Sequence, residues 1–140
     1  MGQSIIITID GPAGAGKSTL GRRLAQALGY RYVDSGALYR AVAWQARETG
    51  LDPADSAAVA RLLAHFQPHI ASDAQGFHLS VDGREITQGL RTPEVSQDAS
   101  RVAAQPQVRQ WVSDILQSLV QDGGVVAEAT YAAMLREDKA

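Results

Sequence analysis

A glycine-rich segment followed by a lysine and a serine is the strongest chemical signal in this sequence. Residues 11–18 read Gly-Pro-Ala-Gly-Ala-Gly-Lys-Ser and fit the pattern G-x-x-x-x-G-K-[ST]. Glycines let backbone N–H groups approach oxygen atoms closely, the lysine can reach phosphate oxygens, and the serine hydroxyl can ligate Mg²⁺. The pattern predicts a loop that holds nucleoside triphosphate phosphates. The residues expected to contact the triphosphate are Gly11, Pro12, Ala13, Gly14, Ala15, Gly16, Lys17, Ser18 and Thr19.

The chain on both sides of this loop supports the prediction. The β-branched run 5–9 predicts a strand before it. Apolar residues recur at helical spacing after it, at Leu20, Leu24, Ala27 and Leu28. They predict a helix that buries this face, and a helix N-terminus favours anions through its unpaired N–H groups and its dipole. A turn that merely joins a strand to a helix is the alternative, and it accounts for fewer of these features.

Composition sets broad limits on function. The 140 residues are enough for one compact domain, and the formal charge of −2 gives no reason to expect general binding to nucleic acid or to an acidic membrane. The absence of cysteine excludes disulfides, thiolate nucleophiles and cysteine-ligated metals. No apolar run approaches the length of a membrane span or a signal-peptide core. We therefore expect a cytoplasmic protein.

Further elements follow in an alternating order. A short strand is predicted at 30–33 and a helix at 37–48, so the opening reads strand, loop, helix, strand, helix. This order is typical of a parallel sheet with helices on its faces. Asp52 and Pro53 are expected to begin the next helix, as the N-cap and the first helical residue.

The period changes from helix to strand at 68–86. Apolar and polar residues alternate there, and Asp82-Gly83 predicts a two-residue hairpin turn, so we expect a small antiparallel unit inserted into the α/β chain. Thr92-Pro93 then opens a helix, Pro106 separates it from a longer one, and 124–128 predicts a last buried strand. The parallel strands number only three, fewer than such sheets usually have, so the sheet is expected to be incomplete.

Four segments together resemble bacterial cytidylate kinases. They are 7–19, 34–40 (Asp-Ser-Gly-Ala-Leu-Tyr-Arg), 91–96 (Arg-Thr-Pro-Glu-Val-Ser) and 99–109 (Ala-Ser-Arg-Val-Ala-Ala-Gln-Pro-Gln-Val-Arg). The first segment alone indicates only an NTPase, whereas the others are far more selective. The resemblance extends from the first strand to Glu128.

The resemblance implies a P-loop NTPase-type α/β fold, with a three-layer parallel sheet and a small antiparallel CMP-binding insertion. It divides the chain into a kinase core at 1–66 and 92–128, the inserted hairpin unit at 67–91, and a helical segment at 129–140. The activity implied is phosphoryl transfer from ATP, with Mg²⁺, to CMP or dCMP.

The same resemblance implies roles for individual residues. Lys17 and Arg40 would be catalytic, and the residues that hold the acceptor nucleotide would be Ser35, Arg40, Arg91, Ser100 and Arg109. Arginines fit this task because two anionic nucleotides must be brought together, and a guanidinium holds phosphate bidentately. Polar groups at Ser100 and Arg109 would distinguish cytosine from uracil. Each residue also has a plain alternative, since Arg40, Ser100 and Arg109 are equally compatible with a solvated helix surface.

Magnesium would be ligated by Ser18, with Glu128 acting indirectly because an acid commonly follows a buried strand beside such a loop. A single acid after apolar residues is a weak signal. The histidines His65, His69 and His78 have no metal-ligand spacing and are interpreted as structural or exposed.

The sequence departs from the family pattern after Glu128. The family continues with a Gly-Arg-Asp segment, whereas this chain has Ala-Thr-Tyr at 129–131. Residues 131–140 resemble the helix that leads into the family's lid, so we expect a junction near 128/129 and a chain without the lid arginines. An internal deletion, a gene-prediction error or an incomplete sequence would each produce this. We expect a monomer for a complete chain, and for a shortened one an uncovered sheet edge, poor solubility and self-association.

Two other functions stay open. A nucleotide-binding module would keep the loop and lack transfer activity. A kinase for another small metabolite would prefer a non-pyrimidine acceptor.

Overall fold

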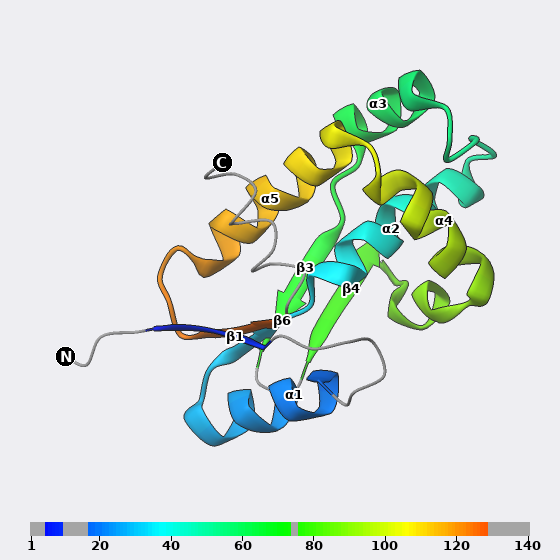
Figure 1. Ribbon diagram of the computed structural model, residues 1–140. Helices are drawn as coiled ribbons and strands as arrows, with labels where there is room; N and C mark the ends of the chain where they lie inside the picture. Colours follow the sequence, from blue (N-terminus) through cyan, green and yellow to red (C-terminus); the bar gives the residue numbers. More distant parts are fainter. Residues whose placement is uncertain (1–4, 10–16, 74–75, 129–140) are drawn as a thin grey trace. The chain divides into compact units, whose positions relative to one another are not determined.

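The computed structural model describes residues 5–9, 17–73 and 76–128 (Figure 1). The helices are α1 (Lys17–Leu28), α2 (Ser35–Glu48), α3 (Ser56–His65), α4 (Pro93–Ala103), α5 (Pro106–Val120) and the 3-10 helix η1 (Thr87–Arg91). The strands are β1 (Ile6–Ile9), β2 (Arg31–Val33), β3 (His69–Ser72), β4 (Phe77–Val81), β5 (Arg84–Glu85) and β6 (Val125–Glu128). These elements form two compact units, the first within 1–35, 71–77 and 113–140 and the second within 36–70 and 78–112.

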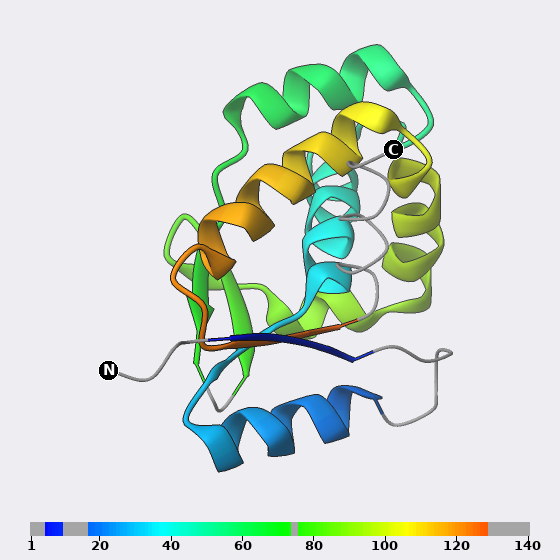
Figure 2. The same ribbon diagram turned by 60° about the vertical axis from the view of Figure 1, so that its left-hand side comes forward.

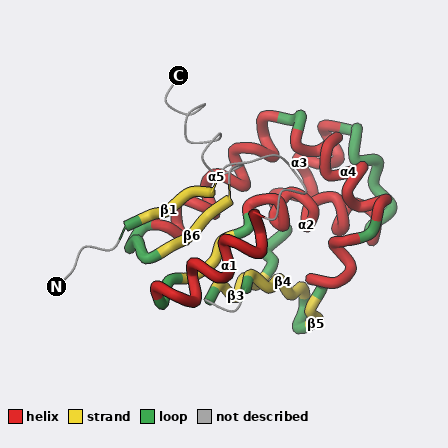
Figure 3. Tube along the Cα trace, turned by 60° about the horizontal axis from the view of Figure 1, so that its bottom comes forward, coloured by secondary structure: helices red, strands yellow, loops and turns green. Residues whose placement is uncertain are grey.

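The first unit is built on a parallel sheet in the order β1-β6-β2. Val125 in the central strand β6 is in register with Ile6 of β1 and Arg31 of β2. Figure 3 shows β1 and β6 running side by side. Val125, Val126 and Ala127 are fully buried, as expected for a central parallel strand covered on both faces. The three parallel strands predicted from the sequence are confirmed.

Helix α1 packs on this sheet through its smallest residues. It contacts β6 and β2, and Figure 2 shows it lying along one face of the sheet. A Cβ atom added at Gly21 would lie 2.8 Å from Tyr32 Cε1 and 3.3 Å from Ile9 Cδ1. Only glycine permits this approach, and Ala25, one turn further on, is fully buried beside it.

The apolar face predicted for α1 is wrong at three of its four positions. Leu20 is 58% exposed, Leu28 is 46% exposed and Ala27 is exposed as well, whereas Leu24 is half-buried. The close approach at Gly21 decides which face is buried, and it turns the larger side chains toward solvent. Ile5 and Ile6 at the start of β1 are also exposed. Within the described residues β1 pairs with β6 alone, which agrees with the predicted incomplete sheet.

The second unit contains the predicted hairpin. Strands β3, β4 and β5 form a sheet in that order, and Ser80 of β4 pairs antiparallel with Glu85 of β5. The turn residues Asp82 and Gly83 have φ values of 51° and 80°, the left-handed conformation that this hairpin turn requires. The antiparallel unit and its turn are confirmed.

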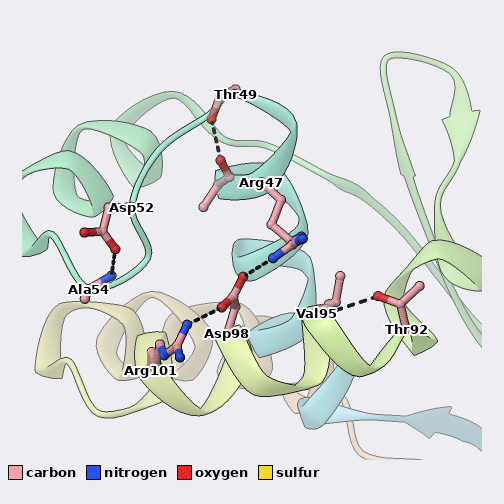
Figure 4. Close-up of polar contacts among 9 residues, drawn as sticks. Arg47, Thr49, Asp52, Ala54, Thr92, Val95, Asp98 and Arg101 are labelled. Atoms are coloured by element: carbon pink, nitrogen blue, oxygen red, sulfur yellow. Dashed lines mark hydrogen bonds and ion pairs between the residues drawn. The ribbon is translucent and has the colours of Figure 1, made fainter.

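The predicted start of the third helix is wrong by one turn. Helix α3 begins at Ser56, and its N-cap is Asp55, whose side chain accepts a hydrogen bond from the Ala58 N–H at 3.2 Å. The Asp52 side chain instead accepts from the Ala54 N–H at 2.9 Å, closing a local turn (Figure 4). Both aspartates are suited to cap a helix N-terminus, and because Asp52 forms a local turn instead, the helix begins after Asp55.

The other helices follow their predicted patterns. Thr92 caps α4 by accepting from the Val95 N–H at 3.2 Å, with a proline at the first position. The predicted inner face of α5 is buried at Val108, Val112, Leu116 and Val120. None of the helices in the described ranges is long and apolar enough to cross a membrane.

Candidate functional site

The phosphate-binding motif occupies a connection between a strand and a helix. Strand β1 ends at Ile9 and α1 begins at Lys17, and a phosphate-binding loop of this type is expected between a strand and a helix. The predicted ATP contacts at 11–16 lie outside the described residues, as do the side chains of Lys17 and Ser18. Thr19 is exposed in the first turn of α1. The described backbone therefore places the motif between a strand and a helix, the setting in which such loops hold phosphates.

Three strand ends meet at one edge of the parallel sheet. In register, Ile9 at the end of β1 lies opposite Glu128 of β6, and Val33 at the end of β2 lies opposite Ala127. The motif follows the first of these strands, and Ser35 follows β2 by two residues. Ligands of open α/β sheets bind beyond the carboxyl ends of the strands. The backbone of Glu128, whose side chain is not described, and Ser35 both lie at this edge.

Ser35 is the first residue of α2, and its hydroxyl group is unusual. The residue is fully buried, and its Oγ atom has no hydrogen-bond partner in the described part of the chain. A buried hydroxyl without a partner costs about 1–3 kcal/mol. This cost is offset where a ligand supplies the missing partner. Ser35 is thus the predicted site residue with the clearest structural sign of a ligand.

The other predicted acceptor residues belong to the second unit. Arg40 is half-buried in the second turn of α2. Arg91 ends η1 directly before α4, and Ser100 lies on α4; both residues are exposed. Arg109 lies in the first turn of α5, where its Nη1 atom donates to the carbonyl oxygens of Ala103 at 3.2 Å and Ala104 at 3.3 Å.

Helix α4 sets the spacing of three of these residues. Arg91 precedes its first turn, Ser100 is near its end, and Arg109 binds its last carbonyl groups. The 11 residues of α4 extend roughly 16 Å, so the structure places the backbone of Arg91 and the Arg109 guanidinium at opposite ends of the helix. The carbonyl contacts also give Arg109 a structural role, which its prediction as a base-reading residue did not include.

Sequence reasoning missed an ion-pair cluster beside these residues. Asp98 of α4 is buried, and its carboxylate accepts hydrogen bonds from Arg47 of α2 and Arg101 of α4 (Figure 4). The i,i+3 spacing of Asp98 and Arg101 was visible in the sequence. The contact with Arg47 joins residues 51 positions apart, and no sequence pattern indicates it.

Two further observations concern other sites. Among the described residues, no three His, Asp or Glu side chains gather in a way that could hold a metal ion. A cavity of about 290 Å³ lies in the second unit, and none of its lining residues is a predicted site residue. It is lined by Gln45, Thr49, Leu51, Arg61, Leu62, His65 and Phe66.

Comparison with known proteins identifies relatives along most of the chain. The sequence profile of the family described as cytidylate kinase matches residues 7–131. The cytidylate kinase of Pelotomaculum thermopropionicum is 44% identical over 123 residues, which are 87% of this chain and 54% of that protein. The bifunctional pantoate ligase/cytidylate kinase of Synechococcus elongatus is 44% identical over 132 residues, or 91% of this chain and 25% of that protein.

A third relative, the cytidylate kinase of Exiguobacterium sp., is 39% identical over 128 residues, 91% of this chain and 57% of that protein. The chain thus spans a little more than half the length of these cytidylate kinases and about a quarter of the bifunctional protein. The profile match covers far more than half of the chain, and the identities are high. On this evidence, the chain belongs to the cytidylate kinase family.

Proposed function

We propose that this chain serves the transfer of the γ-phosphoryl group of ATP to CMP or dCMP, which yields ADP and the nucleoside diphosphate. Family membership supports the reaction type. The P-loop context between β1 and α1 supports ATP as the donor, with Mg²⁺ entering alongside its phosphates.

Positioning and charge stabilisation would carry the catalysis, because phosphoryl transfer needs little covalent work from the protein. The 11–16 backbone, Lys17 and Thr19 would bind the ATP phosphates, Ser18 would ligate Mg²⁺, and Glu128 would orient the ion's water ligands. Mg²⁺ supplies charge neutralisation between the phosphate groups. Lys17 and Arg40 would stabilise the charge on the transferred group.

The residues proposed for acceptor binding are those that the family resemblance indicates. Ser35 and Arg40 would hold the acceptor nucleotide, with Arg40 near its phosphate, and Arg91 would lie at the pocket. Ser100 and Arg109 would bind the cytosine edge. The proposal includes a division of the chain into a kinase core at 1–66 and 92–128, an acceptor-binding insertion at 67–91 and a segment at 129–140. It also includes a cytoplasmic location, and an oligomeric state that depends on whether the chain is complete.

The buried hydroxyl of Ser35, which has no hydrogen-bond partner among the described residues, is the observation that carries the proposal. Removal of the Ser35 hydroxyl distinguishes a role in ligand binding from a role in the stability of the fold. Ser35→Ala removes a polar atom that has no described protein partner, so stability should hold or rise slightly. Ser72→Ala is the matched control, because the Ser72 Oγ donates to the Tyr32 carbonyl oxygen at 2.8 Å and its loss should reduce stability.

The test measures binding and turnover on the full chain with CMP, dCMP, UMP and AMP. We expect CMP and dCMP to bind. Ser35→Ala should weaken CMP binding about tenfold, because the loss of one hydrogen bond changes affinity by about that factor. Ser72→Ala should leave CMP binding unchanged. ATP binding with transfer to no acceptor would instead identify a nucleotide-binding module. Preference for a non-pyrimidine acceptor would identify a kinase for another metabolite.

A further inference from the structure

The buried carboxylate of Asp98 joins two helices of the second unit. The Asp98 side chain is only 5% exposed. Its Oδ2 atom accepts from Arg47 Nη1 of α2, and its Oδ1 atom accepts from Arg101 Nη1 of its own helix α4, both at 2.8 Å (Figure 4). The Arg47 contact therefore connects α2 to α4, whereas the Arg101 contact stays within α4.

Stability alone is a poor reason for this arrangement. Burying a carboxylate carries a large desolvation cost, and the attraction of a buried pair often does no more than offset it. The side chains of Arg47 and Arg101 are 48% and 59% exposed, so solvent screens both contacts. A directed hydrogen bond from a planar guanidinium does, however, fix geometry. The contact between Arg47 and Asp98 is thus better suited to hold the two helices in one arrangement than to stabilise the fold.

The helices held in this way carry the proposed acceptor residues Arg40 and Ser100, and Arg91 lies directly before α4. Arg40 lies two turns before Arg47, on the same face of α2, because seven residues return a helix almost to its starting direction. Ser100 lies two residues after Asp98 on α4, and Arg91 leads directly into that helix. A change in the angle or the distance between α2 and α4 would therefore move Arg40 relative to Ser100 and Arg91.

We propose that Asp98 is a positioning residue for the acceptor nucleotide, and that it acts through Arg47 by fixing α4 against α2. It would not touch the nucleotide. The inference rests on the proposed function, because it assigns Asp98 to the geometry of the CMP site, and it adds a positioning contact between α2 and α4 to that site.

The two arginines supply a matched pair of variants. Arg47→Gln breaks the contact between the helices, and Arg101→Gln breaks only the one within α4. We expect Arg47→Gln and Asp98→Asn each to raise the Kd for CMP about tenfold, since small displacements of binding groups have large effects. Arg101→Gln should change it by less than about twofold. ATP binding should stay the same in all three, and Arg47→Lys should restore most of the CMP affinity because it keeps a charged donor for Oδ2.

A distance measurement tests the geometry without any nucleotide. The chain has no cysteine, so cysteines introduced at the exposed positions Glu48 of α2 and Gln97 of α4 are the only labelling sites for spin labels. The label-to-label distance distribution should broaden or shift in Arg47→Gln and Asp98→Asn, and it should stay unchanged in Arg101→Gln.

The outcomes separate the two proposals. An altered distance distribution together with weaker CMP binding and unchanged ATP binding supports the positioning role. An unchanged distance distribution in Arg47→Gln and Asp98→Asn overturns the positioning role. An altered distribution with unchanged CMP affinity overturns it as well. So does an equal loss of CMP affinity in Arg47→Gln and Arg101→Gln. Failure of the proposed function is distinct, because it would be seen in the unmodified chain as an absence of CMP binding, and the positioning role would then fall with it.

Discussion

The two compact units differ in how many large hydrophobic side chains their described residues leave exposed. The four large hydrophobic side chains recorded as exposed all lie on β1, α1 or the residue before β1, in the first unit: Ile5, Ile6, Leu20 and Leu28. The second unit has side-chain caps on α3 and α4 and the Asp98 ion pairs. It also stacks Phe66 on Trp111, with ring centroids 5.7 Å apart.

This difference follows from the architecture of each unit. A parallel sheet draws its strands from distant parts of the chain and needs cover on both faces and at its edges. In the second unit the hairpin turn and the caps of α3 and α4 are satisfied by nearby residues, whereas the contacts of Arg47 with Asp98 and of Phe66 with Trp111 join distant segments. The part that would bind ATP therefore depends on more of the surrounding polypeptide than the helices that would bind the acceptor. In the described residues, no other element buries Leu20 and Leu28 of α1.

The largest expected contrast comes from removing one leucine in each unit. Leu38 is fully buried in α2, so Leu38→Ala should destabilise the fold by about 3 kcal/mol through lost burial and a cavity. Leu20→Ala removes a mostly exposed side chain and should cost no more than about 0.5 kcal/mol. Urea unfolding of both variants measures the two values. Equal losses would show that Leu20 is covered in solution, and the contrast between the units would be lost.

The contact between α1 and the sheet should be intolerant of added volume. Gly21→Val places side-chain atoms where Tyr32 and Ile9 already lie and should cost about 2 kcal/mol. Ala27→Val, on the exposed face of the same helix, controls for helix propensity and should cost about 0.5 kcal/mol. Thermal and urea unfolding give both numbers. If Gly21→Val proves as mild as its control, α1 does not pack on the sheet through this residue.

The local capping of the second unit predicts a smaller effect. Asp55→Ala removes the α3 cap and should cost about 1 kcal/mol, whereas Asp52→Ala breaks only a turn and should cost roughly half as much or less. Urea denaturation of the two variants compares them. The reverse order would mean that the helix begins at Asp52, as the sequence alone suggested.

Exposure of the leucine stripe predicts a change in association rather than in folding. We expect the uncovered apolar surface to cause self-association. Replacing Leu20 and Leu28 together by lysine should reduce it and leave the free energy of unfolding within about 0.5 kcal/mol, because these side chains are 58% and 46% exposed. Sedimentation velocity over a range of concentrations provides the readout. Unchanged association would show that another surface is responsible, and a loss of folding would show that the stripe is buried.

The features predicted correctly from sequence have short-range causes. The Asp82-Gly83 turn requires left-handed backbone at both positions, and Thr92-Pro93 carries both a cap and a fixed first helical residue. The errors arose where two local solutions compete. Asp52 and Asp55 can each cap a helix, and α1 offers both a leucine stripe and a line of small residues. Only the distance between helix and sheet at Gly21 decides between those two faces.

The residues of the candidate site stay a prediction, and the sequence indicates them only where they lie in recognisable motifs. Ser35, Arg40, Arg91, Ser100 and Arg109 were all chosen from segments that resemble the family. The buried state of the Ser35 hydroxyl and the capping contacts of Arg109 depend on tertiary packing, so the sequence contained no signal for them. The contact of Asp98 with Arg47 is likewise a product of how α2 meets α4.

Calorimetric titration of the full chain with CMP and with UMP tests the central claim most directly. We expect CMP to bind at least about tenfold more tightly than UMP, because groups placed to bond the cytosine edge are left unpaired by uracil. Ser35→Ala should lose CMP affinity without losing stability. Equal affinity for CMP and UMP, or CMP binding that Ser35→Ala leaves unchanged, would contradict the account.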